Sequence, residues 1–357
     1  MSSDKILKRI GFLLSYDFHI HFFQTVIDEL KRHPKEFEIY VESTVENLKQ
    51  RHVDIIFFAS GYGLKEFPRA TKIQVFHSCL ISKGVQYHPL HKENDFIVTT
   101  STKETEIYKQ HGTEPKMAFL PFGNTQTDLL FRAPKLSHKD LGLDPNVPTI
   151  LYAPTFTKEL TSISSFKNNL VRILRGSNNE KRNIIIKVHP AINTSNKVIQ
   201  KKFPGRLSTF KMWQGWFEEA ERQEGVHFVH DFDEDITEYM KLSDVLVGDV
   251  SGVNFIWLAT GKPMILFNSW RTILARVKNF LHLPSYFDAN GPEWMYRRKM
   301  GYQSYSTSKV SELIKKALKS DPMKKERENL ISILFDSNAD GNTGKRIVEH
   351  IRETPHS

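Results

Sequence analysis

The stretch 244–267, DVLVGDVSGVNFIWLATGKPMILF, constrains the fold more than any other part of the chain. Its pattern indicates a buried strand, a tight turn, a helix, a Gly-Lys-Pro break and a second buried strand. The turn holds Asp249, Ser251 and Gly252 where the first strand ends and the helix begins. Backbone N–H groups and the positive end of a helix dipole meet at such a turn, so we expect it to bind a phosphate.

The composition indicates a soluble globular protein of about two domains. The chain has 357 residues, of which 39% are hydrophobic and 25% are charged. No window approaches the roughly 20 apolar residues of a membrane span. The segment MSSDKILKRIGFLLSY lacks the apolar core and cleavage site of a secretory signal, so we expect a cytoplasmic location. The single Cys79 excludes an intramolecular disulfide and any multi-cysteine metal site.

The chain is basic, with a net charge of +9 and a pI near 9.3. Such a charge attracts nucleic acid, anionic lipid or a phosphorylated substrate, or it serves solubility alone. Nucleic acid is disfavoured because the sequence has neither zinc-finger spacing nor an RNP-like strand. The pair His19 and His21 alternates as in a strand, which would point the two rings to opposite faces, so we expect no metal site.

Short apolar runs alternate with amphipathic ones along the whole chain. The expected strands are 9–16, 36–42, 54–60, 72–78, 95–101 and 117–123, then 149–155, 183–190, 225–231, 244–250 and 263–268. Between several of them lie helical stretches such as 102–112, where Ser101 and Glu104 predict a capping-box start and Gly112 a glycine stop. Apolar strands separated by helices favour a parallel sheet covered on both faces. We therefore predict an α/β protein of two doubly wound, Rossmann-like domains that face each other across a cleft. The first spans 1–131, a proline-rich linker spans 132–148 and the second spans 149–357.

In doubly wound sheets, ligands bind beyond the carboxyl ends of the strands. The polar and shape-setting residues at these ends are His77, Gly123, Asn124, Asp128, Thr155, Lys187, His189, Asp249, Ser251 and Gly252. His189 follows an apolar strand and precedes a proline, so it either donates to a phosphate oxygen or is a core histidine. His77 ends a strand of the first domain and could accept a proton from an attacking hydroxyl.

Two stretches mix aromatic and charged residues. The segment 206–223 carries four aromatic side chains close to helical spacing, and the segment 294–302, WMYRRKMGY, adds three basic residues. Both suit either a membrane-interface patch or a packed aromatic core with a solvated charged face.

Six motifs in order resemble the CDP-glycerol glycerophosphotransferases of teichoic-acid and capsule synthesis, which have a GT-B type fold. They are QVFHSCLISKG (74–84), FGNTQTDLL (122–130), ILYAPTFTKE (150–159), IIIKVHP (184–190), the stretch 244–267 and DSNADGNTGKRIVEHI (336–351). They are similar to the family's W-H-G-T-P-L-K-x-x-G, G-x-P-R-x-D-x-L, I-L-Y-A-P-T-W-R, histidine-proline strand, D-Y-S-S turn and closing F-D-G motif. Together they cover the chain from about residue 70 to its end.

The resemblance implies a transferase that moves glycerol phosphate from CDP-glycerol to a hydroxyl of a glycan or lipid-linked acceptor and releases CMP. It implies that His77 is the base, and that His189, Asp249 and Ser251 hold the donor's diphosphate, with Lys187 and Gly252 beside them. The donor is a substrate, and no further cofactor or metal is implied. An enzyme of this kind would work at the inner face of the cell membrane, with an anionic surface as a partner.

The sequence departs from the family at several positions. Ser78 replaces a glycine, Thr157 stands in place of an arginine, and Val250, Gly252 and Ile256 replace tyrosine, serine and an acid. These departures leave room for CDP-ribitol as donor. They also leave open a GT-B glycosyltransferase or epimerase that uses a nucleotide-diphosphate sugar, and a non-enzymatic binding protein on the same fold.

Overall fold

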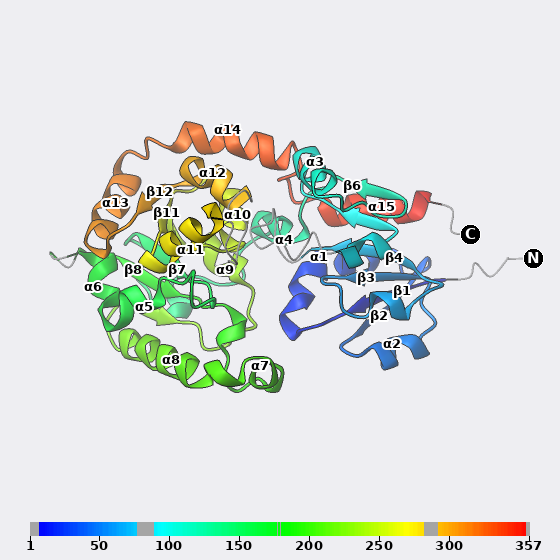
Figure 1. Ribbon diagram of the computed structural model, residues 1–357, viewed down its shortest axis with the longest axis horizontal. Coiled ribbons are helices and arrows are strands. Elements are labelled where there is room, and N and C mark those ends of the chain that lie inside the picture. The colour runs from blue at the N-terminus through cyan, green and yellow to red at the C-terminus, as the bar shows by residue number, and fades with distance from the viewer. Residues whose placement is uncertain (1–6, 77–88, 177, 179, 282–291, 355–357) are drawn as a thin grey trace, which may run out of the picture. The chain divides into compact units, whose positions relative to one another are not determined.

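The computed structural model describes residues 7–76, 89–176, 178, 180–281 and 292–354. Figure 1 shows the course of the chain from the N-terminus to the C-terminus. The described residues separate into two compact units. Of these described residues, the first unit contains 7–76, 89–132 and 331–354, and the second contains those between 133 and 330. His77 lies outside the described residues.

The first unit is built on a six-stranded parallel sheet. Its strands are β1 (Lys8–Leu13), β2 (Phe37–Glu42), β3 (Ile55–Phe58), β4 (Thr71–Val75), β5 (Phe96–Val98) and β6 (Ala118–Leu120). The order is β2-β1-β3-β4-β5-β6, so the direction of winding reverses between β1 and β3. The inner strand β3 is apolar and buried along its whole length, because helices cover both faces of such a sheet, whereas the edge strand β2 includes charged and exposed residues.

The helices of the first unit are α1 (Ile20–Leu30), α2 (Val45–Gln50), α3 (Thr102–Gln110), α4 (Thr125–Asp128) and α15 (Thr343–Glu353). The side chains of Thr44, Ser101 and Asn124 cap the starts of α2, α3 and α4. In α3, the Ser101 hydroxyl accepts from the Glu104 N–H at 3.2 Å, and the Glu104 carboxylate accepts from the Thr100 N–H at 2.5 Å. Gly112 follows with a φ of +65°. The serine cap and the glycine stop predicted for this helix are confirmed, and the Glu104 carboxylate reaches the N–H one residue before the cap, at Thr100.

The end of the chain belongs to the first unit, which corrects the predicted domain of 149–357. The apolar face of α15, with Ile347, Val348 and Ile351, is buried in the same core as Val26 and Ile27 of α1. The sequence shows that this helix is amphipathic, but periodicity does not say which of two cores its apolar face fills.

The second unit is also built on a six-stranded parallel sheet. Its strands are β7 (Thr149–Ala153), β8 (Asn183–Ile186), β9 (Val226–Phe228), β10 (Val245–Gly248), β11 (Met264–Phe267) and β12 (Tyr302–Ser304). The order is β12-β11-β10-β7-β8-β9, so the winding reverses between β7 and β10. The predicted α/β class with two doubly wound parallel sheets is therefore confirmed.

Helices surround this second sheet. They are α5 (Ile163–Phe166), α6 (Leu170–Arg175), α7 (Lys197–Lys202), α8 (Leu207–Glu221), α9 (Ile236–Leu242), α10 (Val253–Leu258), α11 (Trp270–Phe280), α12 (Pro292–Met300), α13 (Thr307–Lys319) and the start of α14 (Lys324–Phe335), whose residues from 331 on belong to the first unit. In α8, Phe210, Trp213 and Phe217 are buried, so a packed core is the correct interpretation of that aromatic stretch.

The segment predicted as a linker is part of the second unit. It forms one short 3-10 turn, Lys139–Leu141, and the Asn183 side chain of β8 donates to the carbonyl of Asp144 at 2.7 Å. These contacts hold the segment against the sheet instead of leaving it as a free connection.

Candidate functional site

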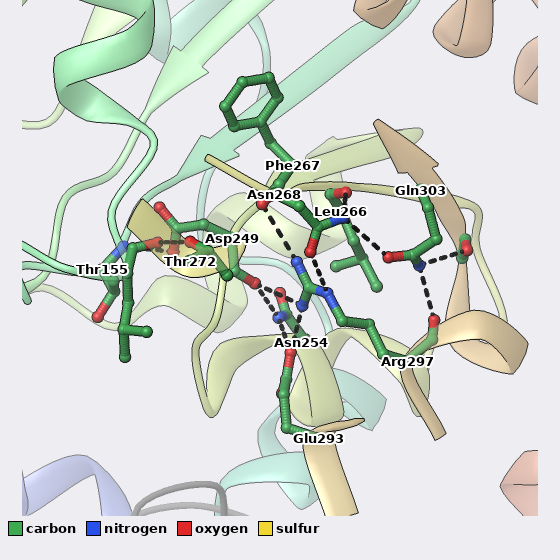
Figure 2. Close-up of polar contacts among 12 residues, drawn as sticks. Thr155, Asp249, Asn254, Leu266, Phe267, Asn268, Thr272, Glu293, Arg297 and Gln303 are labelled. Atoms are coloured by element: carbon green, nitrogen blue, oxygen red, sulfur yellow. Dashed lines mark hydrogen bonds and ion pairs between the residues drawn. The ribbon is translucent and has the colours of Figure 1, made fainter. Parts of the chain in front are cut away.

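Asp249 ties together the two strand ends where the second sheet reverses its winding (Figure 2). Its side chain is fully buried at the end of β10. One carboxylate oxygen accepts from the Thr155 N–H at 2.9 Å, and the other accepts from the N–H and the hydroxyl of Ser162 at 2.7 and 2.8 Å. The loop that follows β7 is thereby held against the turn that follows β10.

The surroundings of Asp249 act on its pKa in two directions. Burial raises the pKa to about 6, while the hydrogen bonds from Ser162 and Thr155 and the charge of Arg297 lower it. The group is therefore mainly ionised at pH 7. Both carboxylate oxygens already accept from the protein, so the structure gives Asp249 an anchoring position beneath the turn.

The turn after Asp249 presents a row of backbone donors. Within the described part of the chain, the N–H groups of Val250, Ser251, Gly252 and Val253 donate to no other residue. Val250 and Ser251 are buried. The helix that follows, α10, has only six residues, so the donors themselves matter more here than a helix dipole. Consecutive free N–H groups form a concavity that suits an anion.

Two predicted residues follow the neighbouring strand β8. Lys187 is 3% exposed, and its ammonium donates to the carbonyl of Phe232 at 2.6 Å and to that of Asp231 at 3.4 Å. Burial lowers the pKa of Lys187 to about 8, and nearby carboxylates, chiefly Glu234, oppose that shift. These contacts hold β8 to the 231–232 loop, so Lys187 has a structural partner that the sequence does not reveal.

His189 is half-buried at the start of a 3-10 turn, Pro190–Ile192. Its Nδ1 atom accepts from the Ala191 N–H at 3.0 Å, and its ring centroid lies 4.6 Å from that of Phe156. An imidazole that accepts through Nδ1 carries its proton on Nε2 when it is neutral. The local structure therefore fixes one tautomer, which makes Nε2 a hydrogen-bond donor.

Thr155 is fully buried at the end of β7, with its N–H bound to Asp249. Among the residues that the structure describes, its hydroxyl has no hydrogen-bond partner. Thr155, Asp249, Ser251 and Gly252 thus meet at one strand-end site, as the strand-end rule predicts.

The three described candidates of the first unit, Gly123, Asn124 and Asp128, make structural contacts within that unit. The Asn124 side chain caps α4 by accepting from the N–H groups of Gln126 and Thr127. Asp128 accepts from the Thr343 hydroxyl at 2.7 Å and from the Gly344 N–H at 2.9 Å, which caps α15. Burial raises the pKa of Asp128, and these two hydrogen bonds lower it.

Gly123 has a matching structural role. Its φ is +112°, and a Cβ atom there would lie 2.4 Å from the Thr343 hydroxyl oxygen. Only glycine allows the last helix to approach this closely. In the described structure, Gly123, Asn124 and Asp128 therefore act as packing and capping residues.

The sequence interpretation missed a buried ion pair. Arg297 and Glu293, both on α12, are 1% and 0% exposed, and Arg297 Nη1 donates to Glu293 Oε1 at 2.5 Å. The segment 294–302 therefore carries a core arginine, whereas both interpretations of this segment from the sequence placed its basic residues at the surface. Opposite charges four residues apart are the signal that could have revealed the pair.

Comparisons with known proteins identify the family of the chain. The sequence profile of the family described as CDP-Glycerol:Poly(glycerophosphate) glycerophosphotransferase matches residues 48–353. No curated protein matches the chain by sequence. The chain is similar to the solved wall teichoic acid polymerase TagF, with a TM-score of 0.69 and 14% identity over 99% of this chain and 90% of that one.

Two further solved structures share the fold. A UDP-N-acetylglucosamine 2-epimerase has a TM-score of 0.58 and 14% identity, with 99% of both chains covered. The complex of MnaA from S. aureus with UDP has a TM-score of 0.57 and 12% identity, with 97% of this chain and 96% of that one covered. The family match spans more than half of the chain and includes both the His189 strand and the turn 249–252. The chain therefore belongs to the CDP-glycerol:poly(glycerophosphate) glycerophosphotransferase family, and it is a transferase of that type.

Proposed function

We propose that the chain transfers glycerol phosphate from CDP-glycerol to a hydroxyl of a glycan or lipid-linked acceptor in cell-envelope polymer synthesis. The observation that carries this proposal is the family match together with the row of unpartnered N–H groups at residues 250–253. These donors lie where the winding of the second sheet reverses, which is the usual ligand position in such sheets. The oxygens of a diphosphate would accept hydrogen bonds from these N–H groups.

The roles of the donor-side residues follow from their contacts. The N–H groups of Ser251 and Gly252 bind the diphosphate. Asp249 does not contact it but holds the turn to the loop after β7, through the N–H groups of Thr155 and Ser162. The Nε2–H of His189 donates to a phosphate oxygen and stabilises the charge that grows on departing CMP. Lys187 contributes a positive charge nearby through its buried ammonium.

The reaction exchanges one P–O bond for another. The acceptor hydroxyl oxygen forms a bond to the β-phosphorus of the donor, and the bond from that phosphorus to the CMP oxygen breaks. His77 takes the hydroxyl proton as general base. This role rests on the motif QVFHSCLISKG and stays a prediction, because residue 77 lies outside the described structure.

The test is nucleotide release from alternative donors. Purified protein is incubated with CDP-glycerol and an oligo(glycerol phosphate) acceptor, and in parallel with UDP-sugars. We expect CMP release with CDP-glycerol, and at least a hundredfold loss of it in His77→Ala and His189→Ala, which removes a base or a charge-assisted contact. Release of UDP instead would replace the proposal with a sugar-transferring or epimerising enzyme. Equal activity in wild type and both variants would exclude catalysis by these histidines.

We further propose that α11 docks the protein on an anionic membrane surface. Its large apolar residues Trp270, Ile273, Leu274, Val277 and Phe280 are between 42% and 82% exposed. At 100° per residue they fall within an arc of about 120°. Thr272 and Ala275, on the opposite side of the helix, are buried. Large apolar residues that face outward from a globular unit mark an interaction surface.

Charge identifies the partner of this apolar face. By the same helical spacing, Arg271 and Lys278 flank one side of the face and Arg276 flanks the other. Apolar residues bordered by basic ones suit the boundary between acyl chains and anionic head groups. No helix in the described part of the chain is long and apolar enough to cross a membrane. Attachment through α11 would therefore be peripheral.

Vesicle sedimentation tests this attachment. The protein should bind vesicles that contain phosphatidylglycerol more tightly than pure phosphatidylcholine. Double replacement Trp270→Ser/Phe280→Ser should weaken this binding at least fivefold, because both side chains would lose apolar burial. Val198→Ser, at a half-exposed valine on α7, is the matched control. Unchanged vesicle binding in the double variant would refute the role of α11, and a dimer that dissociates in that variant would identify the face as a contact between copies.

A further inference from the structure

Arg297 binds the carboxyl ends of two neighbouring strands at once (Figure 2). Its Nη1 donates to the Asp249 carbonyl at 3.0 Å, just after β10. Its Nη2 donates to the carbonyl of Phe267 at 3.2 Å, at the end of β11, and its Nε donates to the Asn268 side chain at 3.0 Å. Five N–H donors in a fixed plane allow arginine to make such a set of contacts, which lysine cannot reproduce.

Glu293 completes the arrangement from one turn earlier on α12. Besides its bond to Arg297, its Oε1 accepts from the Asn254 side chain at 3.0 Å. The same Asn254 amide donates to the Asp249 carbonyl at 2.6 Å. The Asp249 carbonyl therefore accepts from two side chains, Arg297 and Asn254, that both also donate to Glu293. A fully buried guanidinium needs such a partner, because an unpaired buried charge is strongly destabilising.

Gly248 makes room for this arrangement. A Cβ atom at position 248 would lie 2.8 Å from Asn254 Oδ1. The last residue of β10 must therefore be small for Asn254 to reach the Asp249 carbonyl.

Holding that carbonyl also fixes the donor on the other side of the peptide. The peptide group is planar and trans, so the Val250 N–H points opposite to the Asp249 C=O. With the carbonyl directed at Arg297 and Asn254, the N–H is turned away from them. It opens the row of N–H groups at 250–253 that donate to no described residue. A buried N–H without a partner is costly unless a ligand supplies an acceptor.

We propose that Arg297, paired with Glu293, is a positioning residue that holds the turn 249–252 in the conformation that binds the donor's diphosphate. This inference rests on the proposed function, because it assigns the diphosphate to that turn. Arg297 itself is buried beneath the turn and acts only through the Asp249–Val250 peptide.

Two variants act on the same carbonyl from different sides. Arg297→Lys keeps the charge but loses the planar set of donors, and Asn254→Ala removes the second donor without changing any charge. Each should weaken CDP-glycerol binding in calorimetry about tenfold, because a displaced turn would lose about one hydrogen bond from its N–H groups to the diphosphate. The KM for an oligo(glycerol phosphate) acceptor should stay within twofold. The double variant should lose less than the product of the two single effects, because both act on one peptide group.

Arg298→Lys, the next residue of α12 and exposed, is the matched control and should bind like wild type. Folded variants with unchanged donor affinity, or with equal losses for donor and acceptor, would overturn the positioning role. Insolubility of both variants would overturn it too, by assigning the pair to the fold alone. If wild type itself fails to bind CDP-glycerol, the proposed function fails, and that result is distinct from unaltered binding in the variants.

Discussion

Replacement of Asp128 by asparagine separates a structural role from a substrate-binding one. The carboxylate accepts two hydrogen bonds from the first turn of α15, at 2.7 Å from the Thr343 hydroxyl and 2.9 Å from the Gly344 N–H. An asparagine oxygen can keep one of them, but its NH₂ group then faces the other donor. One buried donor is left without an acceptor, and one charge-assisted bond is lost.

The expected cost follows from these contacts. A hydrogen bond to a charged group contributes roughly 1.5–3 kcal/mol, and an unsatisfied buried donor costs about 1–3 kcal/mol. The raised pKa of Asp128 shows that burial of its charge is itself unfavourable, so neutralisation returns part of the cost. We expect a net loss of about 2–3 kcal/mol in the local stability of α15. That loss corresponds to an increase of roughly 30- to 150-fold in the amide exchange rates of this helix.

Hydrogen exchange followed by mass spectrometry measures this change on peptides that cover 343–353. The control is Asp28→Asn on α1, which loses a partly exposed pair with Arg132, while its remaining oxygen can still accept from the Gln24 side chain; it should change exchange by less than about fivefold. Donor affinity is measured on the same samples. If Asp128→Asn leaves the exchange of α15 unchanged but weakens CDP-glycerol binding, then Asp128 contacts substrate and the capping interpretation is wrong.

Three further predictions concern single positions. Gly123→Ala forces a side chain into a φ of +112° and against the Thr343 hydroxyl, so the temperature of thermal unfolding should fall by several degrees. Gly142→Ala is the control: its φ is +68° but no atom of the described residues lies in contact with the added Cβ, so its unfolding temperature should fall less. Burial raises the pKa of Glu293 from 4.5 to about 7, so its contribution to stability is lost as pH rises from 4.5 through 7. In urea titrations at several pH values, the unfolding free energy of Glu293→Gln minus that of wild type should therefore rise over this interval, and a constant difference would contradict the raised pKa. Lys187→Met should speed amide exchange in residues 229–233 at least tenfold through loss of the bond to the Phe232 carbonyl, and unchanged exchange there would show that the ammonium is not an anchor.

The sequence predicts the two sheets well because their strands are short apolar runs between strong helix signals. The helix start at Ser101 and Glu104 is also local, and it is found where it was predicted. Strand β12 (Tyr302–Ser304) was missed, because three mixed residues at a sheet edge carry no alternation to detect. The predicted second domain, 149–357, wrongly included α15, because amphipathicity does not identify the core that an apolar face fills.

The candidate site was predicted in part, for the same physical reasons. Asp249, Ser251 and Gly252 were found from a strand-turn-helix pattern that is contiguous in the sequence. The anchoring contact of Lys187 and the capping contact of Asp128 depend on partners 45 and 216 residues away, which no local pattern reveals. Arg297 was interpreted as a solvated charge because it stands in a basic run with Arg298 and Lys299, and the structure shows that only these two neighbours are exposed.

The placement of α15 also governs how the protein is made. Its buried residues Ile347, Val348 and Ile351 complete the core of a unit whose sheet is already finished at residue 120. During translation, the apolar face of the first unit stays uncovered until α15 has been synthesised, some two hundred residues later. A fragment that stops at residue 132 would keep that face exposed. We therefore expect such a fragment not to fold by itself, and we expect the nascent first unit to need a chaperone.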